Sequence, residues 1–414
     1  MSHPAPKKVL ILTNDTGFGH RSTAKAIASA LQEQHGDACT VEIVNPTEHK
    51  DASPILRNSQ SDYDRLIREW PDFYRFSYEA VNDPLPSAIV EGAFTVMLYL
   101  AILDILKTTQ PDVIVNTYET YHAPLDAVFT MTRQRAPLVT TVTDLATLHR
   151  TWFNPVTDLC LVPTQIAYDL ALNYGLPPEK VKVTGLPINP AFARETRTRT
   201  ELRAELGWRE DLITVLAVGS TRVRNLPETL HVLNHSGLPL QFVIACGGDD
   251  ELYAHFSQVE WHHPAHVYNL VSNMPLMMHA ADCTVGKAGG LYVTEALACG
   301  LPILLVDLIE GQETGNADFV VDGGAGELVD NPIAALECLF HWLVKDGQLL
   351  KERAQNARQM GHPRAAYEAA DLVWQMADQK QSRQTGLAKH RRSVTELLNE
   401  FNIPWKEFWK ELGS

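Results

Sequence analysis

The sequence predicts an α/β protein with two doubly wound domains and a cleft between them. Short apolar runs typical of buried strands alternate with amphipathic helical patterns along most of the chain. One charged helical segment, residues 194–209, interrupts this alternation and suits a linker. The 414 residues are enough for two such domains. We therefore expect a first domain at 1–193, a second at 194–365, and a helical segment with a basic amphipathic tail at 366–414.

The first domain is expected to open with a strand at residues 9–13, a turn with two glycines and a helix whose apolar residues recur every three to four positions. Residues 45–92 are irregular and rich in aromatic side chains, and residues 94–106 form an apolar helical pattern. No run reaches the roughly 18 apolar residues of a membrane-spanning helix, and the N-terminal run is too short for a signal peptide. Further strands are predicted at 41–44, 111–117, 137–142, 159–162 and 181–184.

The second domain repeats the alternation of strands and helices. Helices are predicted at 226–233, at 336–344 and from 348 onward, with Gly347 marking the break between the last two. Strands are predicted at 212–218, 240–246, 267–271, 283–285 and 303–306.

A strand, a glycine turn and a helix follow one another between residues 283 and 300. Gly289 and Gly290 form the turn, and Gly300 ends the helix as a candidate left-handed C-cap. Such a turn gathers free backbone N–H groups at a helix N-terminus, which makes an anion site. Glu295, one turn into the helix, is placed to accept hydrogen bonds from sugar hydroxyls. A phosphorylated, ribose-bearing ligand fits this pattern, although a glycine pair after a strand is common in α/β proteins.

The composition excludes several classes of protein. A net charge of −15 argues against general nucleic-acid binding, which requires a basic face. The six cysteines are scattered without a CxxC pair, so neither a zinc site nor a disulfide framework is expected. We expect reduced thiols in a cytoplasmic protein.

His20 directly follows the first glycine turn and precedes Arg21. A residue at the carboxyl end of a parallel strand faces the ligand crevice of a doubly wound sheet. A neutral imidazole at this place is suited to take a proton from an acceptor hydroxyl. A capping or solvent-exposed histidine is the alternative interpretation.

Two segments have the composition of membrane-surface elements. Tyr63, Trp70, Phe73 and neighbouring aromatics precede the apolar helical pattern of the first domain. The tail joins a basic patch at 380–392 to an amphipathic pattern that contains two tryptophans. The alternatives are that the aromatics close a domain core and that the tail packs back across the first domain.

Several motifs occur in a fixed order along the chain: GFGHR at 17–21, TVTDLATLHRTWF at 141–153, VTGLPI at 183–188, CGG at 246–248, KAGG at 287–290, TEAL at 294–297, GLP at 300–302 and GQETGN at 311–316. Together they resemble the motifs of GT-B glycosyltransferases. The branch concerned contains monogalactosyldiacylglycerol synthases, processive diacylglycerol glucosyltransferases and the UDP-N-acetylglucosamine transferase of peptidoglycan synthesis. The resemblance implies a GT-B fold, in which a cleft separates two Rossmann-like domains.

The resemblance also implies an inverting transfer of a hexose from UDP-glucose or UDP-galactose, with no metal and no cofactor. His20 is the implied catalytic base, with Asp144 in second place. The implied donor-binding residues are Glu295 for the ribose, Leu270 and Val271 for the uracil, Gly219, Ser220, Gly289 and Gly290 around the diphosphate, Arg222 and Lys287 for its charge, and Gln312, Glu313 and Asn316 for the sugar.

The implied acceptor is a diacylglycerol hydroxyl, presented to the first domain from the cytoplasmic face of the cell membrane by a peripherally bound enzyme. The implied acceptor or membrane contacts are Gly17, Phe18, Gly19, Trp152 and Phe153. Three alternatives stay open. They are a glycosyltransferase with a soluble acceptor, a UDP-sugar 2-epimerase that would use Asp15 and Asp144, and a non-catalytic nucleotide-sugar-binding protein.

Overall fold

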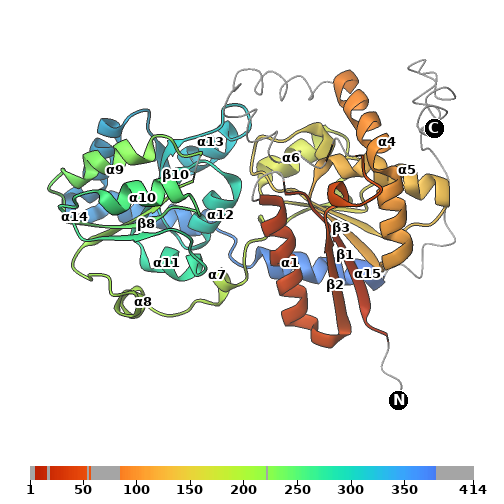
Figure 1. Cartoon of the computed structure of the whole chain (residues 1–414), viewed down its shortest axis with the longest axis horizontal. Helices are drawn as coiled ribbons and strands as arrows, with labels where there is room; N and C mark the ends of the chain where they lie inside the picture. Colours follow the sequence, from red (N-terminus) through yellow and green to blue (C-terminus); the bar gives the residue numbers. More distant parts are fainter. Residues whose placement is uncertain (1–4, 16–18, 54–55, 57–83, 221, 379–414) are drawn as a thin grey trace.

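Two α/β domains lie side by side in the computed structural model of the chain (Figure 1). The structure describes residues 5–15, 19–53, 56, 84–220 and 222–378, with the side chains of helix α4 described only from residue 91 onward. The predictions for Gly17, Phe18, the aromatic segment at 63–78 and the tail at 380–414 lie outside these residues.

The first domain is built on a parallel six-stranded sheet with the strand order β2-β1-β3-β4-β5-β6. Alternate residues of β1 enter two different apolar clusters, Val9 and Ile11 on one side and Leu10 and Leu12 on the other. The sheet is therefore buried on both faces, as continuous apolar strands predict. The strands are β1 Lys7–Leu12, β2 Cys39–Val44, β3 Val113–Asn116, β4 Leu138–Thr141, β5 Leu159–Val162 and β6 Val181–Val183.

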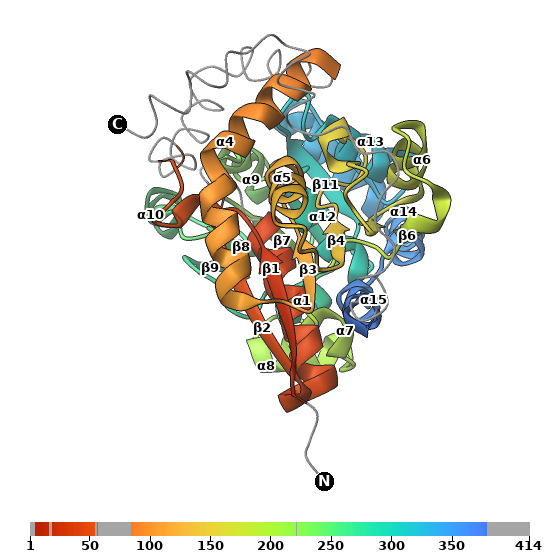
Figure 2. The same ribbon diagram turned by 90° about the vertical axis from the view of Figure 1, so that its right-hand side faces the viewer.

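Helices cover both faces of this sheet (Figure 2). Helix α1 (Gly19–His35) packs on the face of Val9, and α4 (Pro84–Thr109) and α5 (His122–Thr132) pack on the face of Leu10. Helix α6 (Gln165–Asn173) covers the β5 end of the sheet.

The second domain has its own parallel six-stranded sheet, with the order β12-β11-β10-β7-β8-β9. Helices α11, α12 and α13 contribute to one apolar cluster against this sheet, and α9, α10 and α14 contribute to the other. The strands are β7 Ile213–Val218, β8 Leu240–Ala245, β9 Ala265–Tyr268, β10 Cys283–Lys287, β11 Ile303–Asp307 and β12 Gly326–Leu328. The helices are α9 Leu226–Asn234, α10 Asp250–Gln258, α11 Met274–Ala280, α12 Gly290–Ala298, α13 Thr314–Asp322 and α14 Pro332–Met360.

The expected fold class, two doubly wound α/β domains, is confirmed, and several local expectations hold. Gly300 has φ +67°, and the N–H groups of Gly300 and Leu301 donate to Leu297 and Ala296, so the helix ends in a Schellman motif. Helix α14 breaks at Gly347, where residues 344–347 have non-helical backbone angles. The short helix α7 (Ala191–Arg194) leads into the linker, and the linker itself contains the helix α8 (Arg199–Leu206).

Several boundaries differ from the sequence prediction, most of them by a few residues. Strand β9 ends at Tyr268, so residues 269–271 form a loop. Strand β10 continues through Gly286 to Lys287. The Tyr292 ring packs closely against Gly286, where a side chain would clash with it. Helix α4 begins at Pro84 rather than near residue 94, because proline is well suited to the first turn of a helix.

Helix α4 is also more apolar than the sequence analysis allowed. Among the described residues, one stretch, Glu91–Thr109, has the length and the apolar composition of a membrane-crossing helix, with a mean hydropathy of 1.4. Its buried positions Leu98, Ala101, Ile102 and Ile105 follow helical spacing and pack in the first domain. The opposite face presents Leu100, which is 58% exposed. This helix is therefore both a core element and a source of exposed apolar surface.

The last described helix, α15 (Ala365–Asp378), leaves the second domain and packs beside α1 in the first (Figure 1). Small residues at Ala366, Ala369 and Ala370 allow a close approach, and Val373 completes the apolar contact. The chain therefore passes between the domains twice, through the linker after β6 and through the segment before α15.

The contact of α15 with the first domain can be tested at Trp374. Its ring stacks on His35 with 3.7 Å between centroids, and Lys7 Nζ lies 3.9 Å from the same ring. We expect Trp374→Ala to lower the free energy of unfolding by about 1–3 kcal/mol, since the stack and the cation–π contact are lost with the buried area. Urea unfolding measures this. The control is Phe340→Ala, a half-exposed aromatic on α14 that should change stability by less than about 0.5 kcal/mol.

Candidate active site

Each sheet has one place where the strand order reverses direction, and the two places meet across the cleft. In the first sheet this switch lies between β1 and β3, and in the second between β7 and β10. Ligands of doubly wound proteins bind in the crevice at the carboxyl ends of such strands. His20 follows β1 in the chain. Lys287 is the last residue of β10, and Gly289 and Gly290 follow it. An added Cβ on Gly290 would lie 3.2 Å from the Thr143 carbonyl oxygen of the first domain, so the two edges are in contact.

His20 lies in the first turn of α1 with one ring nitrogen fixed. Nδ1 donates to the Thr117 carbonyl at 2.8 Å, and the Thr143 hydroxyl lies 3.0 Å from the same nitrogen. A carbonyl oxygen only accepts hydrogen bonds, so Nδ1 carries the ring proton and Nε2 keeps its lone pair. The edge of the Tyr118 ring contacts the imidazole at 5.0 Å between centroids. These contacts fix both the tautomer and the orientation of the ring.

Burial lowers the pKa of His20 to about 4, although the hydrogen bond to Thr117 opposes the shift. The imidazole is therefore neutral at physiological pH and is able to accept a proton at Nε2. This geometry favours a base over a capping or freely solvated histidine.

Two carboxyl groups follow the neighbouring strands β3 and β4. Burial raises the pKa of Asp144 to about 7, the charge of Glu313 adds to the rise, and Lys287 opposes it. Burial likewise raises the pKa of Glu119 to about 7, with a smaller contribution from Asp144. The Oε2 atom of Glu119 is buried and has no hydrogen-bond partner among the described residues. The first-domain edge of the cleft thus holds neutral His20 together with two carboxyl groups whose pKa values are raised to about 7.

The second-domain edge is made of glycine turns that bring backbone close together. The Gly219 N–H donates to the Ala245 carbonyl at 2.8 Å. Gly247 has φ +67°, and a Cβ there would lie 2.5 Å from the Gly219 carbonyl oxygen, so only glycine fits. Gly289 is the N-cap of α12, and Gly290 is its first residue. Strands β7 and β10 are hydrogen-bonded neighbours, which puts the turns after them side by side.

Charged groups lie over this glycine edge. Lys287 and Glu313 form a buried ion pair, and an added Cβ on Gly289 would be 3.6 Å from Lys287 Nζ and from Glu313 Oε1. Glu313 Oε2 also accepts from the Ile309 N–H at 2.7 Å. Glu295 lies on α12, and its backbone carbonyl accepts from the Cys299 N–H at 3.2 Å. Burial raises its pKa to about 8.

Asn316 is fully buried between the two domains. Its Oδ1 accepts from the Leu145 N–H at 3.2 Å, and its Nδ2 donates to the Ala288 carbonyl at 3.0 Å. Both functional groups of the amide are therefore engaged within the protein.

The remaining donor-side candidates surround the same edge. Ser220 follows Gly219 directly, and its hydroxyl accepts from the Arg222 N–H at 3.3 Å. Leu270 is 77% exposed in the loop after β9 and lies against the Gly248 turn, whereas Val271 packs partly into the core. Gln312 immediately precedes Glu313 ahead of α13.

The structure corrects the prediction for Trp152 and Phe153. Both side chains are buried, with 2% and 3% of their surface exposed, so neither is available to a membrane surface. Phe153 stacks on Tyr174, and Trp152 lies 6.2 Å from the His20 ring between centroids. Trp152 therefore supports the histidine from within the core. Of the three glycine-loop residues, only Gly19 is described, as the first residue of α1.

Asp15, named for the epimerase alternative, is engaged elsewhere. Arg21 Nη1 donates to both of its carboxylate oxygens at 2.8 and 2.7 Å, and Asn45 donates to Oδ2 at 3.2 Å. A carboxylate held by an arginine and an amide is poorly placed to act as a free acid or base.

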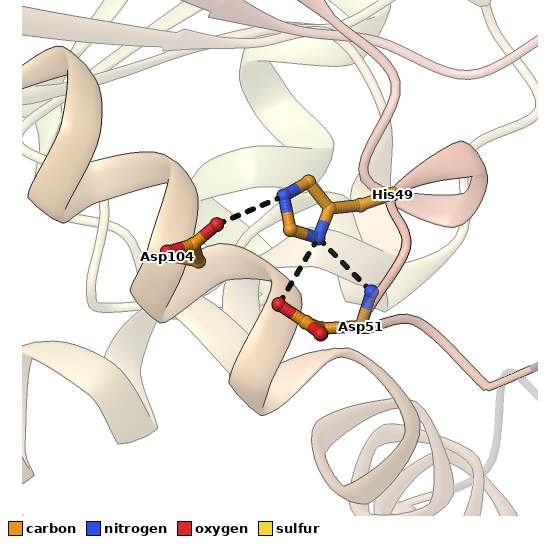
Figure 3. Close-up of side chains that lie close together, drawn as sticks. All are labelled: His49, Asp51 and Asp104. Atoms are coloured by element: carbon orange, nitrogen blue, oxygen red, sulfur yellow. Dashed lines mark hydrogen bonds and ion pairs between the residues drawn. The ribbon is translucent and has the colours of Figure 1, made fainter.

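A separate polar cluster joins the loop after β2 to α4. Figure 3 shows His49 between Asp104, 3.3 Å from Nε2, and Asp51, 3.8 Å from Nδ1. Among the described residues, these three form the one group with metal-ligand spacing. However, Nδ1 accepts from the Asp51 N–H at 3.2 Å, and Lys50 Nζ lies 3.7 Å from Asp104. The protein's own donors thus already satisfy the cluster.

Solved structures with this arrangement define the class. The chain superimposes on Acinetobacter baumannii MurG with a TM-score of 0.58 at 18% identity, covering 89% of this chain and all of the other. It also matches Anabaena HepE in complex with UDP-glucose (0.53, 15%, 91% and 99% covered) and a Neisseria meningitidis UDP-GlcNAc 2-epimerase (0.55, 16%, 89% and 100% covered). These similarities establish the GT-B fold, which transferases and epimerases share.

Sequence relatives then identify the family. Residues 20–188 match the monogalactosyldiacylglycerol synthase family model, and residues 213–375 match the C-terminal domain of glycosyltransferase family 28. A probable chloroplastic monogalactosyldiacylglycerol synthase of Nicotiana tabacum is 32% identical over 91% of this chain and 72% of its own length. The Spinacia oleracea enzyme is 31% identical over 91% and 74%. The chain belongs to the monogalactosyldiacylglycerol synthase family and is an enzyme, a glycosyltransferase, as the motifs predict.

Sequence reasoning missed Thr117, Thr143 and Glu119. The first two hold the His20 ring, and the third places a buried carboxyl oxygen without a partner among the described residues at the first-domain edge. One signal was available, since polar residues directly follow the apolar runs of β3 and β4.

The raised pKa of Glu295 leads to a prediction about stability. Its pKa is 4.5 in an unfolded chain and about 8 in the fold, so the folded protein binds this proton more tightly. The free energy of unfolding therefore falls as pH rises through this interval. Glutamine does not titrate, so Glu295→Gln does not show this fall. We therefore expect the free energy of unfolding of Glu295→Gln, relative to that of the wild type, to increase by roughly 1–2 kcal/mol between pH 6 and pH 8.

Urea unfolding at both pH values, without ligand, measures this difference. Glu337→Gln, at an exposed position on α14, is the control. Its free energy of unfolding should differ from that of the wild type by the same amount at both pH values. A Glu295→Gln gain that is independent of pH would contradict the argument.

Proposed function

We propose that this enzyme transfers a hexose from a UDP-hexose to the hydroxyl of a diacylglycerol, with inversion at the anomeric carbon and without a metal ion. The observation that carries the proposal is His20, whose Nδ1–H is held by the Thr117 carbonyl so that Nε2 keeps its lone pair, at the edge that contacts Gly290 of the donor-side turn. A base on one side and an anion-binding helix terminus on the other are the two halves of a glycosyl transfer site. The names of the relatives favour galactose as the sugar.

The donor would bind to the second domain. The N–H groups at the start of α12 are available to the diphosphate, and the N-terminal dipole of the helix favours its negative charge. Glu295, one turn further along, is placed to accept hydrogen bonds from the ribose hydroxyls. Leu270 and Val271 would lie against the uracil, and Gln312 and Glu313 would meet the sugar. Gly219, Ser220 and Arg222 would complete the phosphate surroundings.

The reaction moves one proton and one glycosyl group. The acceptor oxygen attacks the anomeric carbon and gives its proton to His20 Nε2, while the bond between the anomeric carbon and the diphosphate oxygen breaks. A single displacement of this kind inverts the configuration. Negative charge develops on the leaving UDP, where backbone N–H groups and Lys287 stabilise it in place of a divalent cation. Asp144 is the second candidate for the base, because its pKa near 7 suits proton transfer at neutral pH.

A lipid acceptor requires contact with a membrane, and α4 offers a surface for it. The exposed Leu100 lies on the face of α4 opposite its buried residues, and the stretch Glu91–Thr109 has a mean hydropathy of 1.4. The first turns of α4 extend beyond the body of the first domain (Figures 1 and 2). Peripheral binding at the cytoplasmic face of the cell membrane stays a prediction for this chain, whose relatives are named chloroplastic.

The transfer reaction can be tested directly. Purified protein is incubated with radiolabelled UDP-galactose or UDP-glucose and diacylglycerol in mixed micelles, with EDTA present. We expect label in the organic phase, more from UDP-galactose, and a 10²–10⁴-fold lower rate for His20→Ala because the general base is lost. His49→Ala, outside the cleft, is the matched control and should retain the wild-type rate.

Each other outcome points to a named alternative. Label on a water-soluble product indicates a soluble acceptor. Conversion of UDP-sugar to an epimer supports the isomerase. Transfer that requires added Mg²⁺ contradicts the metal-independent mechanism.

The membrane surface on α4 makes a separate prediction. Leu100→Glu places a charge on the exposed apolar face without touching the core, and we expect at least about fivefold weaker binding to diacylglycerol-containing vesicles. Vesicle co-sedimentation measures this. Met131→Glu on α5, a 70% exposed apolar residue, is the matched control for the charge itself. Equal loss in both variants would show that net charge rather than the α4 face governs binding.

A further inference from the structure

The loop after β4 crosses from the first domain into the second. Leu145 in this loop is 3% exposed and packs in an apolar cluster formed mostly by the second domain, with Val293, Ala317 and Val320 among its members. A first-domain side chain therefore completes the core of the donor domain. This insertion is the structural basis of the domain contact at the cleft.

Two hydrogen bonds join the inserted loop to the second domain, and a third fixes Asn316 within the second domain. Asn316 Oδ1 accepts from the Leu145 N–H at 3.2 Å, while Asn316 Nδ2 donates to the Ala288 carbonyl at 3.0 Å. One residue earlier, the Gly315 N–H donates to the Thr147 hydroxyl at 2.9 Å. A Cβ on Gly315 would lie 2.3 Å from this hydroxyl oxygen, so the approach is too close for any other residue. We call Asn316, Gly315, Leu145 and Thr147 the interdomain clasp.

The clasp is linked to both halves of the active site. Thr143, two residues before Leu145, has its hydroxyl 3.0 Å from His20 Nδ1. The Thr143 carbonyl faces Gly290, and Ala288, which Asn316 holds, belongs to the same glycine turn. One short loop thus contacts the proposed base and the proposed phosphate site.

We propose that Asn316 is a positioning residue, which acts through Leu145 and Thr143 to set His20 at the correct distance and angle from the donor's anomeric carbon. The proposal rests on the proposed function and gives Asn316 a role different from the donor-sugar contact that its motif implies. The Asn316 side chain is fully buried and presents no surface to a sugar, and its oxygen and its nitrogen each bond a backbone group of a different domain.

The expected effect of breaking the clasp depends on the distance between His20 and the donor's anomeric carbon. A base displaced by about 1 Å loses on the order of 10²-fold in rate, whereas nucleotide affinity depends on the second domain alone. Breaking the clasp should therefore reduce kcat and leave UDP binding almost intact. A lost donor-sugar contact would instead raise the KM for UDP-hexose.

The experiment compares Asn316→Ala and Thr147→Val with Thr147→Ser, which keeps the hydroxyl. The control is Asn331→Ala, since Asn331 caps α14 at the Ala334 N–H away from the cleft. UDP affinity is measured by calorimetry, kcat and KM by the transfer assay, and domain separation by small-angle X-ray scattering of the full chain. We expect a 30–100-fold lower kcat for the first two variants, UDP affinity within about threefold of the wild type, and near-normal kcat for Thr147→Ser and Asn331→Ala.

Scattering should show a larger radius of gyration for Asn316→Ala than for Asn331→Ala. An unchanged kcat for Asn316→Ala, or a KM for UDP-hexose that rises while kcat stays constant, overturns the proposal. If the wild type transfers no sugar to any acceptor, the proposed function fails. The scattering comparison then still decides whether the clasp holds the domains, with equal radii counting against it.

Discussion

Parallel strands present all their carboxyl ends at one edge of a sheet, and this constraint determines where every group of the active site lies. Each domain has its strand order reversed once, between β1 and β3 in one and between β7 and β10 in the other. His20 and the glycine turn at Gly289 therefore lie in crevices that the topology itself creates. What the topology does not provide is the relative placement of the two crevices, which requires contacts between the domains.

Those contacts have an electrostatic consequence. Asp144, Glu119 and Glu313 lie close together at the two edges, where Lys287 pairs with Glu313 and also lowers the pKa of Asp144. Burial favours the neutral form of a carboxyl, as it favours neutral His20, so the cleft can hold and move protons near neutral pH without a large change in net charge. An anionic donor is then best met by backbone N–H groups, which contribute no titratable charge.

The parts of the site that local sequence determines were predictable, and the parts that depend on tertiary contacts were not. The strand, glycine turn and helix around Gly289 follow from residue order, because glycine, apolar runs and helix signals act within a few residues. The sequence also places His20 at a strand end. Whether Trp152 faces the core or a membrane depends on neighbours from distant segments, and the resemblance that implied an acceptor or membrane contact gave no sign of its burial. Likewise, the partner of Asn316 lies in the other domain, and the motif that contains it gives no sign of this.

The domain connections differ in kind. The linker after β6 and the segment before α15 are covalent connections, and α15 is held on α1 by apolar packing. These two connections do not depend on the contacts at the cleft. The contact through Leu145 and Asn316 consists of one inserted side chain and two hydrogen bonds between the domains, which makes it the weakest of the connections described. It is also the connection nearest to the proposed substrate site. A transferase must admit a nucleotide sugar and an acceptor, exclude water during transfer and then release its products. Two covalent connections and one weak contact beside the proposed substrate site are compatible with these requirements, and in our proposal the same weak contact aligns the base.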